Sequence, residues 1–152
     1  MKKFLPKGFT LIELLVVIGI LTVLLAIVLI AVNPARQFAQ ANNTQRRSDV
    51  NAILNAVHQY AADNKGKLPT NIATTELTIA AGIANADICA DIVDDYIAGM
   101  PYDPSATGAS YTDCSDYDTK YTILQNANKR VTVKAPGAQD EGGTSVTISV
   151  TR

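Results

Sequence analysis

The first part of the chain is almost continuously apolar. From Phe9 to Val32 the only charged residue is Glu13. A helix needs about 20 apolar residues to cross the hydrocarbon core of a bilayer, because each residue adds about 1.5 Å to its length. The pattern therefore predicts a membrane-spanning helix over residues 9–33, with Glu13 near its start. No second apolar run of this length follows.

The next segment, residues 34–66, is amphipathic. Its apolar residues recur at three- and four-residue steps and form one helical stripe: Val50, Ile53, Leu54, Val57, Tyr60 and Ala61. Gly66 is placed for a left-handed helix cap, and Pro69 follows shortly after it. Pro34 lies inside the combined pattern and is expected to kink or locally loosen the helix rather than end it. The two segments together predict one long helix whose second half packs against a folded head.

Residues 121–152 show the period-two alternation that is typical of strands. The alternating apolar positions are Tyr121, Ile123, Val131, Val133, Val146, Ile148 and Val150. Turn-forming residues at 126–128 and a longer loop over 136–143 separate the runs. We expect three or four antiparallel strands on the helical stripe, which is an α+β fold. The intervening segment, 67–120, is expected to be a connector with short helices over 75–81 and 87–98.

Composition and charge indicate on which side of the membrane the folded head lies. The 152 residues are 47% hydrophobic, and after the apolar run they leave enough chain for one small domain. Lys2, Lys3 and Lys7 precede the run, whereas the first basic residue after it is Arg36. Basic residues favour the cytoplasmic end of a span, so the N-terminus is expected in the cytoplasm and the head outside.

Both cysteines, Cys89 and Cys114, lie in the predicted head. In an oxidising compartment they could pair, which would close a loop of about 25 residues and stabilise the head by ~3 kcal/mol. Two separate buried thiols are the alternative. Export of the head favours the disulfide.

Glu13 is the residue that a plain membrane anchor leaves unexplained. A charge inside a membrane helix costs ~2.5–3.5 kcal/mol at the centre and less near the edge. Glu13 lies only about 6 Å along the helix from Phe9, so snorkelling reduces this cost without removing it. A cleaved secretory signal, cut near Ala39-Gln40-Ala41, is a second reading. Its apolar region would normally span about 7–15 residues, which is shorter than the run here.

The stretch from Lys7 to Glu13, KGFTLIE, resembles the cleavage motif of type IV prepilins and the related pseudopilins. The resemblance implies a leader over residues 1–8, a prepilin peptidase that cuts between Gly8 and Phe9, and N-methylation of the new Phe9 amine. Gly8 suits a cut site, because a residue without a side chain lets a protease approach the backbone. In this family the matching glutamate pairs with the N-terminal amine of a neighbouring subunit, which would give Glu13 a partner.

The order of helix, connector and sheet is similar to the pilin fold. The stretch Met100–Pro104, MPYDP, resembles the Pro-x-Asp-Pro turn of the major type II secretion pseudopilins. The cysteine pair is similar to the disulfide-closed region of many pilins, although Cys114 lies far from the C-terminus. Pro34 also falls a few residues later than the family's helix proline. Pilin and pseudopilin therefore both stay open.

No residue pattern indicates an enzyme, since the sequence has no nucleophile–base set, phosphate loop or metal-spaced His/Cys cluster. Asp113, Asp116 and Asp118 could ligate Ca²⁺, which secretion pseudopilins often hold in this region. Their spacing matches no calcium loop, so we favour a solvated acidic loop and no cofactor.

Charge also bears on partners. The predicted second half of the helix is basic, whereas from Leu68 onward the chain has five basic and eleven acidic residues. Arg46 and Arg47 are therefore candidates for contacts between staggered subunits, with ordinary solvated faces as the alternative. An acidic head argues against generic nucleic-acid binding through it.

These inferences predict a structural subunit of a type IV pilus-like filament. The expected partners are identical or homologous subunits, prepilin peptidase, an inner-membrane assembly platform, and lipid before assembly. The precursor would cross the cytoplasmic membrane once, and the product would be an extracellular pilus or a periplasmic pseudopilus. The alternatives are a type II secretion pseudopilin, a membrane-anchored binding module that never polymerises, and an exported protein cut near Ala41.

Overall fold

The computed structural model describes residues 8–152, without the side chain of Val32. The predicted leader up to Lys7 lies outside the described residues. The chain forms two compact units, of which the first ends at Gln37 and the second runs from Phe38 to Arg152.

Helix α1 spans Leu11–Val32, and every side chain described within it is exposed. Among the described residues, the stretch Leu11–Ala31 is the one helical segment long and apolar enough to cross a membrane. The membrane-length helix expected from the sequence is therefore present.

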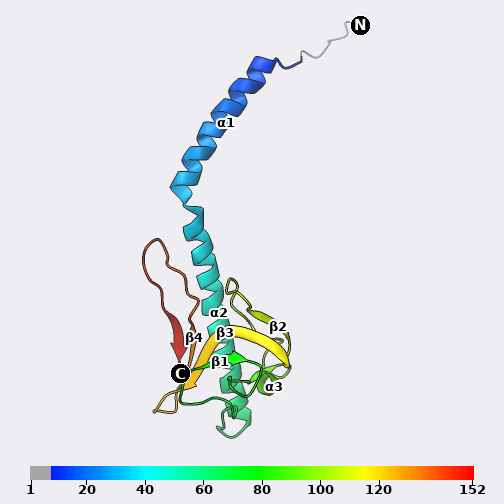
Figure 1. Ribbon diagram of the computed structural model, residues 1–152, viewed down its shortest axis with the longest axis vertical. Coiled ribbons are helices and arrows are strands. Elements are labelled where there is room, and N and C mark those ends of the chain that lie inside the picture. Colours follow the sequence, from blue (N-terminus) through cyan, green and yellow to red (C-terminus); the bar gives the residue numbers. More distant parts are fainter. Residues whose placement is uncertain (1–7) are drawn as a thin grey trace. The chain divides into compact units, whose positions relative to one another are not determined.

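Helix α2 spans Pro34–Asp63 (Figure 1). The long N-terminal helix expected from the sequence is present, with an interruption at Asn33 between α1 and α2. Asn33 separates the helices with a left-handed backbone, at φ 45°, which Asn tolerates better than most residues. Its side-chain and main-chain oxygens both accept the N–H of Arg36, at 3.3 and 3.1 Å. Pro34 then takes the first helical position, where a missing N–H costs nothing.

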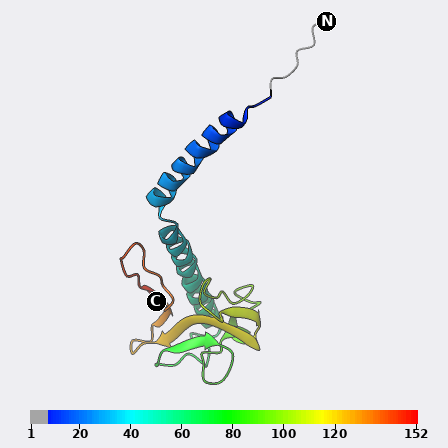
Figure 2. The ribbon, with the colours of Figure 1, turned by 45° about the horizontal axis from the view of Figure 1, so that its top comes forward.

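The head contains a five-stranded antiparallel sheet. Its strands are β1 (Leu77–Ala80), β2 (Ser110–Asp113), β3 (Asp116–Gln125), β4 (Val131–Ala135) and β5 (Ile148–Thr151). The order is β1-β3-β4-β5, and β2 also pairs with β3. The long strand β3 therefore holds most of the sheet together (Figure 2).

The strands expected after residue 120 are confirmed, with β3 and β4 joined by a turn at 126–130. The helix expected over 75–81 is wrong, since residues 77–80 form β1 against Thr122 and Ile123 of β3. The helix expected over 87–98 shrinks to α3, Cys89–Ile92. Residues 77–80 form a strand because they pair with β3, since β propensity depends on neighbouring strands. The sheet thus takes two strands from the segment expected to be a connector.

The apolar core lies between α2 and the sheet (Figures 1 and 2). The predicted stripe supplies Val50, Ile53, Leu54 and Val57, all fully buried. The sheet supplies the buried side chains Tyr121, Ile123, Val131 and Val133. Burying an aliphatic or aromatic side chain of this size contributes about 1.5–3 kcal/mol, so this interface stabilises the head most.

A buried ion pair joins α2 to the 101–104 turn. The Arg46 side chain is fully buried, and its Nε and terminal nitrogen donate to both oxygens of Asp103 at 2.7 and 2.8 Å. It also donates to Asn43 and Ser105. A side chain at Gly137 would collide with this pair, because a Cβ there would lie 2.5 Å from the Asp103 carboxylate.

These contacts correct the expectation that Arg46 reaches a neighbouring subunit, since its guanidinium is enclosed in its own head. Arg47 is half exposed, and its terminal nitrogen lies 3.3 Å from a carboxylate oxygen of Glu141. Burial alone would raise the pKa of Asp103. The charge and hydrogen bonds of Arg46, together with N–H groups of Ser105 and Ala106, lower the pKa below its ordinary value.

Asp103→Asn should destabilise the head by roughly 3–5 kcal/mol, because it leaves a guanidinium buried without its counter-charge. Urea unfolding of the full chain in detergent, followed by near-ultraviolet circular dichroism, measures the change. The double variant Arg46→Met/Asp103→Leu should regain much of the loss, since it leaves no charge to compensate. An Asp103→Asn chain as stable as the wild type would contradict this account.

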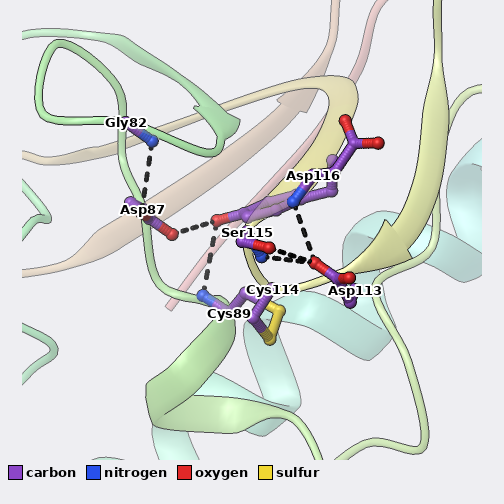
Figure 3. The surroundings of a disulfide bond; sticks show 8 residues. Gly82, Asp87, Cys89, Asp113, Cys114, Ser115 and Asp116 are labelled. Carbon is purple, nitrogen blue, oxygen red and sulfur yellow. Dashed lines mark hydrogen bonds between the residues drawn. A yellow bond between two sulfur atoms is a disulfide. The ribbon is translucent and has the colours of Figure 1, made fainter.

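The predicted Cys89–Cys114 disulfide is present, with Cα atoms 5.3 Å apart. It ties the start of α3 to the turn between β2 and β3 (Figure 3). Hydrogen bonds reinforce this link: the Tyr117 hydroxyl donates to Asp87 at 2.8 Å and accepts the N–H of Cys89 at 3.4 Å. The connector is thereby held to the sheet at its middle.

Replacing both cysteines by serine should lower the free energy of unfolding by about 3 kcal/mol, as a closed loop of this length implies. The same urea titration measures it. Dithiothreitol should bring the wild type close to the variant and leave the variant itself unchanged. Equal midpoints for variant and unreduced wild type would show that the bridge contributes nothing.

Candidate functional site

The start of α1 is organised by a reciprocal pair of side chains. Thr10 is the N-cap residue, and its hydroxyl oxygen accepts the N–H of Glu13 at 3.2 Å. Glu13 in turn accepts the N–H of Thr10 at 2.8 Å and the Thr10 hydroxyl at 2.7 Å, all at one oxygen, Oε2. This arrangement is a capping box, which the sequence Thr-x-x-Glu favours.

The capping box gives Glu13 a structural role within a single chain, at the start of α1. The first N–H groups of a helix lack partners in the helix itself, and a membrane offers no water to replace them. Glu13 and Thr10 satisfy two of these groups. The negative charge also lies at the positive end of the helix dipole. This role was not predicted from the sequence, although the signal T-L-I-E is present in the stretch that carries the cleavage motif.

The Glu13 carboxylate keeps binding capacity after capping. An ionised carboxylate has about four acceptor sites on two oxygens, and the contacts found use only Oε2. Within residues 8–152, no lysine or arginine forms an ion pair with Glu13. Two apolar surface hollows border it, and Phe9 and Val17 line both. The site is thus an anionic acceptor in an apolar surface, suited to one compact cation.

Phe9 lies beside Glu13, since both residues line the two surface hollows. Gly8 and Phe9 are exposed just before the N-cap residue Thr10. A protease therefore meets an accessible backbone at the predicted cut. The new amine would form one residue before the cap that Glu13 completes.

Two of the three candidate calcium ligands, Asp113 and Asp118, have local partners for their carboxylates. Asp113 accepts two N–H groups and the Ser115 hydroxyl in the β2–β3 turn (Figure 3), and the side-chain bond from Ser115 is the main cause of its lowered pKa. Asp118 pairs with Lys120 at 2.5 Å. In the part of the chain that the structure describes, no three His, Cys, Asp or Glu side chains gather as a metal site. Asp116 donates its backbone N–H to the Asp113 carboxylate in the same turn.

Glu13→Ala should weaken the start of α1, whereas Glu13→Gln should preserve it, because glutamine also serves in a capping box. Loss of a cap costs about 1 kcal/mol, roughly a fivefold faster exchange of the N–H groups of residues 10 and 13, which the capping box engages. Hydrogen–deuterium exchange of the chain in detergent micelles measures this. Similar exchange in the alanine variant and the wild type would argue against the cap.

The same region matches a family model described as the prokaryotic N-terminal methylation motif, over residues 6–29. This motif is the signature of type IV pilins and pseudopilins, so the resemblance seen in KGFTLIE is confirmed. The match includes Gly8, Phe9 and Glu13 and ends inside α1. No curated protein and no solved structure matches the chain.

Proposed function

We propose that this pilin-like protein is a structural subunit of a type IV pilus-like filament. One observation carries the proposal: a cleavage motif and a carboxylate with a free oxygen lie together at the start of an apolar, fully exposed helix. Prepilin peptidase would cut the membrane precursor after Gly8, and the amine of Phe9 would be methylated. The chain would then work by assembly, without chemistry of its own.

The amine created by cleavage suits the Glu13 site. Phe9 would carry a positive charge at the edge of an apolar surface, where an isolated charge is costly. An amine and a carboxylate attract each other far more strongly in low dielectric than in water. Pairing of the Phe9 amine of one subunit with Glu13 of the next would cover both charges when α1 helices pack together. Pairing within one chain is the physical competitor, since both groups lie at the same helix end.

The exposed surface of α1 supports the same proposal. Apolar side chains surround this helix on all sides, so it needs lipid or other apolar helices around it. An inner-membrane assembly platform would move it from the first environment to the second. Identical or homologous subunits are the partners in the second environment.

A second candidate is a type II secretion pseudopilin, which would use the same motif in a shorter filament. The 101–104 turn favours it, because its Pro-x-Asp-Pro sequence resembles that of the major pseudopilins and its aspartate forms the buried pair with Arg46. Electron microscopy of the cell surface separates the two, since long surface fibres indicate a pilus. A membrane-anchored module that never polymerises would show no filament on the cell surface or in the periplasm.

Mass spectrometry of the mature protein should find a methylated Phe9 at the N-terminus. Glu13→Gln should be cleaved normally but yield roughly tenfold fewer filaments or worse, because it keeps the cap and removes the charge. The matched control, Thr10→Val, removes the hydroxyl of the cap and keeps the charge, so its yield should stay near that of the wild type.

Wild-type yield from Glu13→Gln would overturn the role of the charge. A mature protein that starts at Met1 would indicate an uncleaved anchor, and one that starts near Asn42 a secretory signal.

A further inference from the structure

A surface groove of about 630 Å³ lies on the head between α2 and the 101–104 turn. Gln45 and Asp49 of α2 line one side, and Pro101, Tyr102 and Pro104 line the other. Tyr102 is about half exposed, at 46%. The groove therefore combines an aromatic and two prolines with a carboxylate.

Asp49 is buried in this groove without a cation. Its side chain accepts the Tyr121 hydroxyl at 2.7 Å and the Gln45 amide at 2.8 Å, and the residue is only 5% exposed. No lysine or arginine among the described residues forms an ion pair with it. Burial raises the pKa of Asp49, hydrogen bonds from Tyr121 and Gln45 oppose the shift, and the nearby Asp103 carboxylate adds to it.

The neighbouring charges do not compensate Asp49. Asp103 is engaged by Arg46 through both of its oxygens. Two buried carboxylates thus lie near one buried guanidinium, which leaves one negative charge in excess. A buried carboxylate without a cation lowers the stability of a folded chain. A cation supplied from outside the subunit would remove that cost.

Arg36 is the basic residue of α2 best suited to supply it. It is exposed, and among residues 8–152 no carboxylate forms an ion pair with it. Arg47 pairs with Glu141. A guanidinium also fits the lining of the groove, since it binds carboxylates through two N–H groups and stacks on aromatic faces.

Arg36 cannot reach Asp49 in its own chain. The two residues are separated by about 20 Å along α2, whereas an arginine side chain extends about 7 Å. Two parallel α2 helices offset by about 20 Å would instead bring Arg36 of one level with Asp49 of the other, beside the groove. Charge complementarity therefore points to a second copy of this chain as the occupant.

We propose that the guanidinium of Arg36 enters this groove on a neighbouring copy, pairs with Asp49 and lies against Tyr102. The contact rests on the proposed filament function and adds a specific head-to-helix connection to it. Asp49 thereby has opposite effects in the two states. It destabilises the free subunit and stabilises the assembled one.

Asp49→Asn and Arg36→Gln, expressed in cells that assemble the wild type, test the contact. Both should be cleaved at Phe9, and both should lower the fraction of subunits recovered as sheared filaments by roughly tenfold. The double variant should be no worse than either single variant, because the two residues act as one pair. Arg47→Gln is the matched control and should leave the yield unchanged.

Two further readouts separate the contact from misfolding. In urea, the detergent-solubilised Asp49→Asn chain should be at least as stable as the wild type, since it loses an uncompensated buried charge. In filaments from co-expressed Arg36→Cys and Tyr102→Cys chains, a bismaleimide with a spacer of about 10 Å should give a covalent dimer of the two variants, because a guanidinium against a tyrosine ring leaves the two Cα atoms too far apart for a direct disulfide. Co-expressed Arg47→Cys and Tyr102→Cys chains should give none.

Wild-type filament yields from both single variants would overturn the contact while leaving the filament proposal intact. A double variant much worse than either single variant, or no Arg36–Tyr102 cross-link, would also overturn it. If the wild type itself forms no filament, the proposed function fails and the contact fails with it.

Discussion

The apolar surface of α1 is the constraint on which the rest of the structure depends. Its side chains are exposed on every side of the helix, and water does not support a surface of that kind. Lipid can cover it in a precursor, and other α1 helices can cover it in a filament. Glu13 is compatible with both environments, because the capping box uses one oxygen and leaves the other for a cation. The same carboxylate can thus serve the single helix first and the assembled helices later.

The head shows a comparable division between stability within the subunit and interaction outside it. Arg46 and Asp103 form a bidentate buried ion pair and fix the 101–104 turn against α2. Asp49, one helical turn further along, is held by neutral donors and keeps an uncompensated charge beside an open groove. A chain selected only for stability has little reason to bury such a carboxylate. Asp49 is therefore better explained by the assembled state than by the isolated head.

The predictable part of this molecule is the part encoded by local pattern. Apolar spacing located α1, the α2 stripe and strands β3 to β5, and the N-terminal motif located Gly8, Phe9 and Glu13. Effects of residues that are distant in the sequence were missed. Strand β1 forms because β3 lies beside it. Arg46 is buried because it pairs with Asp103, which lies 57 residues later in the chain. Two local signals were present but overlooked. Thr10-x-x-Glu13 specifies the capping box, and Asn33-Pro34 specifies a helix end followed by a helix start.

The central claim is that Glu13 pairs with the Phe9 amine of a different subunit. Solid-state NMR of mixed filaments tests it most directly, with one pool of chains labelled with ¹⁵N-phenylalanine and the other with ¹³C-glutamate. Pairing between subunits predicts dipolar transfer between the methylated Phe9 amine and the Glu13 carboxyl carbon in the mixture. Transfer that disappears in the mixture, yet persists in filaments whose every chain carries both labels, would place the pair within one chain and contradict it.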